Sequence, residues 1–407
     1  MLLPSLRHPL FRLLILGQAV SILGTWMQGP ALRWMVLEIK GSPFYLGILG
    51  AVTALPLLLF SLWGGSLSDR LPRTSVLIMA HLVVFIQACS LGLLTDNALI
   101  TFPLILSLAF LFGSAMAFEV PARQALIFDL VGKDDIVNAV AVHSFVFNLA
   151  QFMGPAIAGL LIAAGHTESC FYLKAASTLF VLIIIFILKA TCEKKSMLSA
   201  SYPSVERKTG AFPRAFAFPF EFARKNPLSK VVLLIILSFS ILLLPYSILI
   251  PSITRDMLGL GAREFGFISS ANGVGALTGA TVAAIFGHRG KRERWWWTGT
   301  ILFPFSIICL SMVNSYLQAL LALFITGFSM VITSTSAISL LQLQAEDEER
   351  GKVMGAFTTS FMGFFPLGSL VMGGFAQITG LRETLFAAGS MAFIFVCIQA
   401  VKFKRQR

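Results

Sequence analysis

The sequence predicts an all-α membrane protein in which twelve transmembrane helices form two groups of six. Of the 407 residues, 57% are hydrophobic and 12% are charged, and the mean hydropathy is +0.84. A soluble domain does not reach such values. Apolar runs long enough to cross roughly 30 Å of hydrocarbon predict the helices, and one long polar segment, residues 190–230, divides them into two halves.

Six apolar runs follow one another in the first half, separated by short polar turns such as EIKGS and TDNA. The first run continues beyond Trp34 without a small-residue cleavage site, so we expect it to be a retained span rather than a signal peptide. The six runs are residues 11–37, 43–67, 75–95, 99–118, 137–164 and 170–188. The second half holds six more, at residues 231–253, 265–286, 295–312, 317–340, 354–378 and 385–401.

The basic residues set the orientation of these spans. With the N-terminus inside, 25 of the 31 lysines and arginines fall on the cytoplasmic side. The positive-inside rule therefore predicts that both termini are cytoplasmic. The net charge of +12 is then explained by the basic residues that orient the spans. We therefore expect no nucleic-acid partner. The six remaining basic residues are Arg33, Lys40, Lys174, Arg255, Arg263 and Arg382.

Three parts are expected along the chain: a six-helix bundle at residues 1–190, a cytoplasmic linker at 191–228 and a second bundle at 229–407. The second part of the linker, GAFPRAFAFPFEFARKNPLSK, alternates phenylalanines with basic residues, which predicts an interfacial helix on the inner leaflet. A flexible linker fits its first part equally well. A weak repeat at an offset of 219, which aligns Arg70 with Arg289, indicates pseudo-two-fold symmetry between the bundles.

The loop between the second and third spans carries a motif. Its residues GSLSDRLPR, positions 65–73, resemble the G-x-x-x-D-R-x-G-R signature of the major facilitator superfamily, with Pro72 in place of glycine. The stretches FRLLILGQAVSILGTWMQ, AFEVPARQALIFDL and ERGKVMGAF resemble the branch of enterobactin exporters and macrolide-efflux proteins. This resemblance implies the major facilitator fold and secondary transport.

The resemblance also implies a cytoplasmic gate of ion pairs that break during transport. Asp69 is expected to face the N-terminal end of the eleventh span, and Arg73 to pair with Glu119 at the inner end of span four. The alternative is that the charges of this loop only fix the orientation of the spans. That role accounts for Arg70, but it requires no acidic residue such as Asp69. The expected gate residues are Gly65, Asp69, Arg70, Arg73, Glu119 and Arg123.

Small residues and prolines mark helices that approach closely or bend. They stand at Gly154, Pro155 and Gly159 in the fifth span, and at Pro366 and Gly368 in the eleventh. The fifth-span group resembles a degraded form of a motif found in exporters of the superfamily. Close packing is the favoured role for most of these residues, and hinges at the two prolines are the alternative.

Polar and aromatic residues inside spans are candidates for a substrate cavity, because polar groups are costly in lipid. A hydrogen bond to a neighbouring helix is an equal alternative for each of them. Arg33 is the strongest candidate for an anionic substrate, unless it pairs with Glu38 at the membrane surface. The cavity candidates are Gln18, Trp26, Gln28, Arg33, Trp34, Asn148, Gln151, Tyr246 and Asn272.

Proton coupling has few candidate groups, since no aspartate or glutamate falls near the middle of a predicted span. Glu38, Glu119 and His143 are the possible proton carriers. The five histidines and five cysteines are widely spaced, which predicts no metal site, cofactor or enzyme activity. No phosphate-binding loop is present, which excludes a nucleotide-driven pump.

We therefore expect a monomeric efflux protein of the inner membrane. It would export a hydrophobic or amphipathic small molecule, such as a siderophore or a drug of the macrolide type, by alternating access and proton antiport. Its partners would be this substrate and membrane lipids, and multidrug resistance would be one consequence. The alternative on the same fold is an importer, or a lysophospholipid or nutrient facilitator, without proton coupling.

Overall fold

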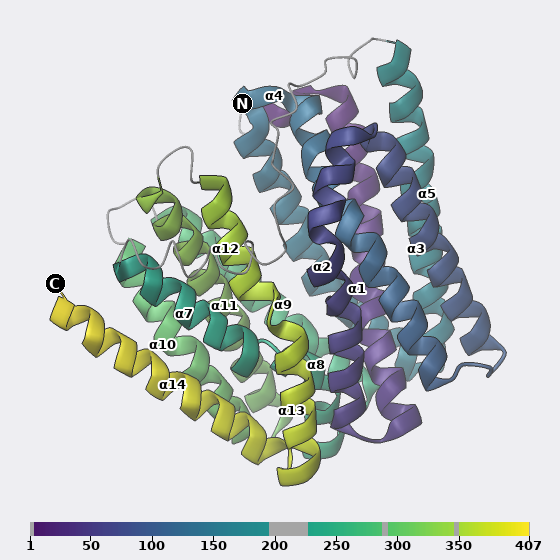
Figure 1. Cartoon of the computed structure of the whole chain (residues 1–407). Coiled ribbons are helices and arrows are strands. Elements are labelled where there is room, and N and C mark those ends of the chain that lie inside the picture. The colour runs from purple at the N-terminus through teal and green to yellow at the C-terminus, as the bar shows by residue number, and fades with distance from the viewer. Residues whose placement is uncertain (1–3, 195–226, 287–291, 346–349, 407) are drawn as a thin grey trace. The chain divides into compact units, whose positions relative to one another are not determined.

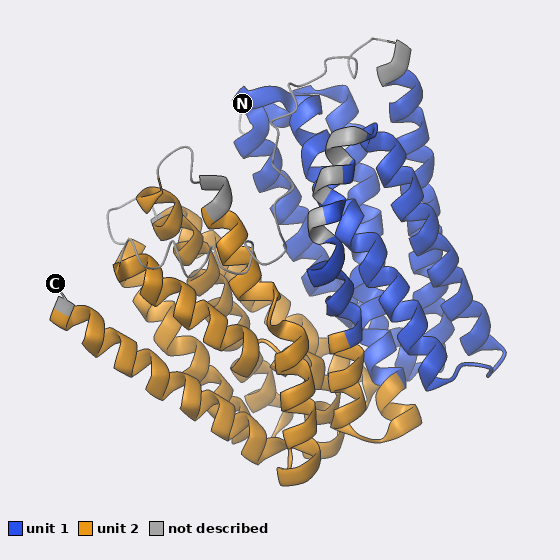
Figure 2. Ribbon diagram, in the orientation of Figure 1, with its two compact units in different colours: residues 1–35, 52–207 blue, residues 36–51, 208–407 orange. Residues whose placement is uncertain are grey.

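The described residues, 4–194, 227–286, 292–345 and 350–406 of a computed structural model, form helices joined by short turns (Figure 1). The chain divides into two compact units (Figure 2). Unit 1 comprises residues 1–35 and 52–207, and unit 2 comprises residues 36–51 and 208–407. The expected interfacial helix in the linker falls on residues 195–226, which lie outside this description.

Five long helices carry the first half of the chain. Each begins at or just after a turn residue, and three of them start at Pro9, Pro43 and Phe102-Pro103, where proline fits the first helical turn. They follow a short 3-10 helix, η1 (Pro4–Arg7), and are α1 (Pro9–Lys40), α2 (Pro43–Arg70), α3 (Arg73–Asp96), α4 (Phe102–Ala163) and α5 (Thr167–Lys194).

Helix α4 corrects the expected boundaries of spans four and five. Its 62 residues would extend about 93 Å as one straight helix, far more than the roughly 30 Å of hydrocarbon. The backbone leaves helical geometry at Gly132 (φ 71°, ψ −177°), a left-handed conformation that favours glycine. Glu119, expected at the inner end of a span, lies within the first limb of α4 with 4% of its surface exposed.

Apolar side chains fill the interior of unit 1 where α3 packs against α4 and α5. This hydrophobic cluster contains residues of α1, α3, α4 and α5. Because lipid is as apolar as these side chains, their close van der Waals contact, rather than exclusion from water, holds the helices together. Its most buried members include Phe11, Leu77, Leu126, Ile185 and Leu188.

Two predicted spans of the second half are interrupted. The seventh breaks at the turn Leu243–Pro245, because proline has no backbone N–H to continue the helix. The eleventh breaks at Gly363 and Phe364, just before Pro366 in the first turn of the next helix. The elements are α7 (Pro227–Leu242), α8 (Tyr246–Ser252), the π-helical turn η2 (Ile253–Met257), α9 (Ala262–Phe286), α10 (Arg292–Ser311), α11 (Tyr316–Gln344), α12 (Arg350–Met362), α13 (Phe365–Thr379) and α14 (Leu381–Gln406).

Ten helical segments among the described residues are long and apolar enough to cross a membrane. Helix α4 counts once among them in spite of its bend, and α10 is not among them. The fold is therefore that of a multi-helix membrane protein.

Glycines bring α9 and α11 of unit 2 into backbone contact. A Cβ atom on Gly279 would lie 2.6 Å from the Phe328 carbonyl oxygen, and one on Gly275 would overlap the Phe324 carbonyl oxygen. In the other direction, a Cβ atom on Gly327 would overlap the Asn272 carbonyl oxygen. No larger residue fits at these positions unless the helices separate.

The corner between α1 and α2, which the sequence assigns to the first half, packs within unit 2. A Cβ atom on Gly47 would lie 2.5 Å from the Ser369 carbonyl oxygen and 3.1 Å from the Gly373 Cα atom. The Arg255 Nη1 atom donates to the Leu37 carbonyl oxygen at 2.9 Å. This contact places a cation at the C-terminal end of α1, where the helix dipole favours it.

We expect Gly275→Ala to lower the stability of the protein, because the added methyl group overlaps a backbone oxygen that cannot rotate away. Overpacking of this kind costs about 1–3 kcal/mol. The measurement is the melting temperature of the purified protein in detergent. The matched control is Gly374→Ala on α13, where no heavy atom lies within 4 Å of the added Cβ; equal melting temperatures for the two variants would contradict the contact.

Candidate functional site

A buried ion pair on α4 is the centre of the candidate site. The Arg123 Nε atom donates to the Glu119 carboxylate at 2.8 Å, across one turn of the helix. The side chains are 13% and 6% exposed, respectively. A carboxylate buried among apolar helices is costly unless a cation pairs with it, so the two charges depend on each other.

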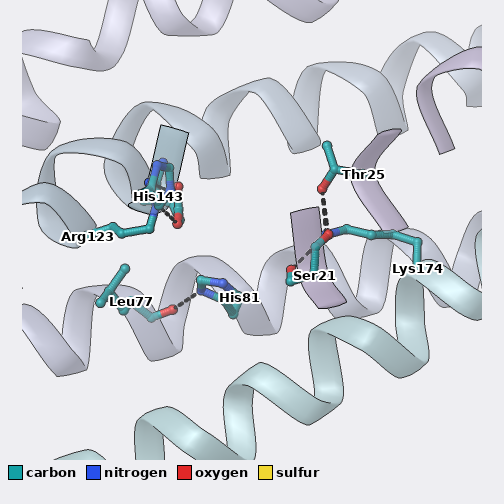
Figure 3. A network of polar contacts seen from close by, with 8 residues as sticks. Ser21, Thr25, Leu77, His81, Arg123, His143 and Lys174 are labelled. Carbon is teal, nitrogen blue, oxygen red and sulfur yellow. Dashed lines mark hydrogen bonds and ion pairs between the residues drawn. The ribbon is translucent and has the colours of Figure 1, made fainter. Parts of the chain in front are cut away.

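His143 reaches the same arginine from the second limb of α4. Its Nε2 atom contacts the Arg123 Nη1 atom, as Figure 3 shows. Because a guanidinium only donates hydrogen bonds, Nε2 accepts here and carries no proton. The bend at Gly132 makes this contact possible, since it turns the chain between two residues of the same helix.

His81 on α3 adds a second imidazole to the network. It is 4% exposed, and its Nδ1 atom donates to the Leu77 carbonyl oxygen at 2.9 Å, as a bond within α3. Glu119 attracts the charged forms of His81 and His143. Two histidines therefore lie within electrostatic range of one buried carboxylate.

Lys174 on α5 is a buried cation with 2% of its surface exposed. Its Nζ atom donates to three oxygen atoms of one turn of α1: the Ser21 carbonyl at 3.2 Å, the Ser21 hydroxyl at 3.2 Å and the Thr25 hydroxyl at 2.9 Å (Figure 3). These acceptors satisfy all three donors of the ammonium group. Glu119 attracts this charge as well.

The close packing of α1 against α5 keeps Lys174 next to α1. A Cβ atom on Gly24 would lie 3.1 Å from the Lys174 Cα atom and would overlap the Ser177 hydroxyl. The buried charged network of unit 1 thus consists of Glu119, Arg123, His143, His81 and Lys174. With neutral histidines and a protonated lysine, it holds one more positive than negative charge.

The expected gate is only partly described. The side chains of Asp69 and Arg70 and the surroundings of Gly65 lie outside the described part of the chain. Arg73 was expected to pair with Glu119, and this pairing is wrong: Arg73 forms an ion pair with Asp129 and donates to the Ala125 carbonyl oxygen at 3.0 Å. Glu119 and Arg123, placed in the same gate, pair with each other.

The cavity candidates of unit 1 lie in several settings. Gln18 and Gln28 are buried, and the Gln28 Nε2 atom donates to the Gln87 Oε1 atom at 3.3 Å. Trp34 is buried, and the Arg33 Nε atom donates to the Gly29 carbonyl oxygen at 3.2 Å. The amide groups of Gln18, Gln28 and Gln87 each retain one buried nitrogen or oxygen atom without a hydrogen bond.

The second limb of α4 carries the other candidates of unit 1. The ring of Phe147 meets Trp26 edge to face at 5.5 Å, and a Cβ atom on Gly154 would lie 2.5 Å from the Trp26 Cβ atom. Asn148 bonds to the Ser144 carbonyl oxygen within its own helix, and Gln151 is half-buried. Pro155 and Gly159 are buried in this limb.

The structure joins the two cavity candidates of unit 2. The Asn272 Nδ2 atom donates to the Tyr246 hydroxyl at 2.7 Å and to the Leu323 carbonyl oxygen at 3.2 Å. Gly368 packs against α7, since its Cβ atom would lie 2.5 Å from the Ile241 carbonyl oxygen. Among the expected proton carriers, Glu38 is exposed in the last turn of α1, whereas Glu119 and His143 belong to the network.

Sequence reasoning missed His81 and Lys174 as members of a site. The available signal was the position of Lys174 inside the apolar run 170–188, since an ionisable residue within a span indicates function. His81 stands inside the run 75–95 in the same way. Neither apolar run shows which helix packs against it, because that depends on the fold.

Comparison with known proteins agrees with this architecture. The family model of the transmembrane secretion effectors matches residues 2–406. The staphyloferrin A transporter of Staphylococcus aureus is 25% identical over 381 residues, which cover 92% of this chain and 93% of the relative. The enterobactin exporter EntS of Escherichia coli is 23% identical over 408 residues, which cover 98% of this chain and 93% of the relative.

Solved structures share the fold. The nucleoside transporter NupG superposes with a TM-score of 0.74 at 12% identity, over 97% of this chain and 99% of that protein. A bacterial homologue of the human lysosomal transporter Spinster superposes with a TM-score of 0.72 at 14% identity, over 99% of this chain and 98% of that protein. The chain belongs to the transmembrane secretion effector family of the major facilitator superfamily, whose members named here are transporters.

Proposed function

We propose that the protein exports a siderophore-like, amphipathic small molecule across the inner cell membrane. One observation carries this proposal: relatives named for staphyloferrin A transport and enterobactin export align with 92% and 98% of the chain. The buried charged network supports it, because five ionisable side chains within apolar helices are costly and a purely structural bundle does not need them.

The proposed mechanism is alternating access driven by proton antiport. The network offers groups that can respond to a proton within unit 1, and Glu119 supplies a buried carboxylate. An importer or a facilitator without coupling remains the alternative, since the staphyloferrin A relative is named as a transporter without a direction.

The proposed topology has twelve spans and cytoplasmic termini. The two limbs of α4, counted separately, and α10 raise the ten candidate spans to twelve. The distribution of basic residues supports the orientation.

The proposed outer gate is the corner 36–51 between α1 and α2. Glycine packing at Gly47, the Arg255 contact with Leu37 and a hydrogen bond from Ser42 to Gln377 attach this corner to the helices of unit 2. The gate would open when these contacts break. The inner gate would involve the Arg73 and Asp129 pair together with Asp69 and Arg70.

Export is tested in cells that either express or lack the protein. After loading with staphyloferrin A or enterobactin, expressing cells should retain less of at least one compound, because the transporter moves it outward. The measurement is the retained compound by mass spectrometry, with empty-vector cells as the control. Equal retention of both compounds would contradict export, and greater retention in expressing cells would support the importer.

The topology is tested by reporter fusions. A fluorescent protein fused after Arg407 should fold and fluoresce, whereas alkaline phosphatase at the same place should be inactive, since it folds only outside the cytoplasm. Alkaline phosphatase inserted after Gly41, in the first predicted outer turn, should be active. An active C-terminal phosphatase would refute the cytoplasmic terminus.

The outer gate is tested by cross-linking Ser42→Cys to Gln377→Cys in a background without the five native cysteines. A short bifunctional thiol reagent should stop transport, because the corner can no longer separate from α13, and a cleavable reagent should allow recovery after reduction. Each single-cysteine variant serves as the control. Full transport by the cross-linked protein would rule out movement at this corner.

A further inference from the structure

Lys174 differs from the other cation of the network in its partners. Arg123 binds a carboxylate directly, whereas the Lys174 Nζ atom is bound by one carbonyl and two hydroxyl oxygens. Among the described residues, no carboxylate lies within ion-pair distance of it. A buried ammonium held by neutral groups alone loses less on deprotonation than one paired with an acid.

The two hydroxyls around Lys174 have different roles. The Thr25 hydroxyl donates to the Ser21 carbonyl oxygen at 3.0 Å, so its hydrogen is already used. The Ser21 hydroxyl contacts Lys174 Nζ and has no other acceptor among the described contacts. Ser21 is therefore the hydroxyl whose hydrogen is available to lysine.

This difference lets the site accept lysine in both protonation states. The ammonium form donates to all three oxygens. In the neutral form the Ser21 hydroxyl rotates and donates to the lone pair on Nζ, so that no buried polar atom is left without a partner. Both states avoid the cost of about 1–3 kcal/mol that an unsatisfied buried group carries.

The other ionisable groups of the network are less suited to exchange a proton. Protonating Glu119 would leave the buried Arg123 guanidinium without its counter-charge. Protonating His143 at Nε2 would place two cations in contact, since this atom accepts from Arg123. Lys174 is free of both conflicts.

Each helix packed around Lys174 presents a defined set of groups to it. Helix α1 contributes the Ser21 and Thr25 oxygens, α3 contributes His81, and α4 contributes Glu119, whose own partner is Arg123. Loss of the lysine proton would leave the paired charges of Glu119 and Arg123 balanced. The network then changes by one unit of charge without breaking its central ion pair.

We infer that Lys174 takes up and releases the proton that couples transport, with the Ser21 hydroxyl as its reversible hydrogen-bond partner. This inference rests on the proposed function. On release, the N–H bond breaks, the electron pair stays on Nζ, and the proton passes to water that reaches the amine when α1 and α5 separate. On uptake the steps reverse, and Ser21 again accepts.

The test uses the full-length protein in liposomes with staphyloferrin A and enterobactin as probes. One measurement is counterflow of labelled probe at equal pH, which needs transport but no coupling. The other is accumulation driven by a pH gradient, with proton movement followed by a trapped pH dye. Lys174→Arg keeps the charge but does not release a proton, and should lower the ratio of pH-driven accumulation to counterflow by about tenfold or more.

Ser21→Ala and Thr25→Val form a matched pair. Each removes one hydroxyl acceptor from the ammonium group, so a purely structural role predicts similar effects. Since Ser21 alone can donate to neutral lysine, Ser21→Ala should lower the same ratio more than Thr25→Val does. Gly374→Ala, distant from the network in sequence and on α13, serves as the reference variant.

The outcomes separate the two proposals. Wild-type counterflow without pH-driven accumulation would support transport and overturn the inference. A wild-type ratio in Lys174→Arg, or equal effects of the Ser21 and Thr25 variants, would also overturn it. If the wild-type protein moves neither probe in either measurement, the proposed function falls, and the inference falls with it.

Discussion

The pairing of Glu119 with Arg123 is the constraint on which the polar interior of unit 1 depends. A carboxylate that is only slightly exposed among apolar helices persists because a guanidinium binds it one helical turn away. The pair in turn sets the surroundings of both histidines and of Lys174, since each of these groups is within electrostatic reach of Glu119. Removing either partner would leave an uncompensated charge in the middle of the bundle.

The two units differ in the acidic and basic side chains that they bury. Among the described residues, the nearly fully buried acidic and basic side chains are His81, Glu119 and Lys174, and all three belong to unit 1. Unit 2 relies on glycine contacts between α9 and α11 and on neutral hydrogen bonds such as that between Asn272 and Tyr246. Buried charge is therefore concentrated in unit 1, whereas close glycine packing occurs in both units, as at Gly113 and Gly154 of unit 1.

Sequence patterns predicted the membrane class, most helices and the family, because apolar runs and the loop motif are local features. They did not show that the helix continues between residues 118 and 137, where charged residues suggested the end of a span. Glu119 and Arg123 neutralise each other across one turn, so the helix continues. The environment of Lys174 was equally beyond reach, since its hydroxyl partners lie about 150 residues earlier and only the packing of α1 against α5 brings them together.

Because a single glycine bends α4, the side-chain positions on one limb are fixed relative to those on the other limb. The chain turns at one residue rather than through a flexible loop, so a loop cannot accommodate an inserted or deleted residue. Inserting one residue after Gly132 would rotate the whole second limb by about 100°. His143 would then leave Arg123, and Gly154 would leave Trp26, although neither residue had been mutated. The number of residues at this bend is therefore as important for the network as the identity of its side chains.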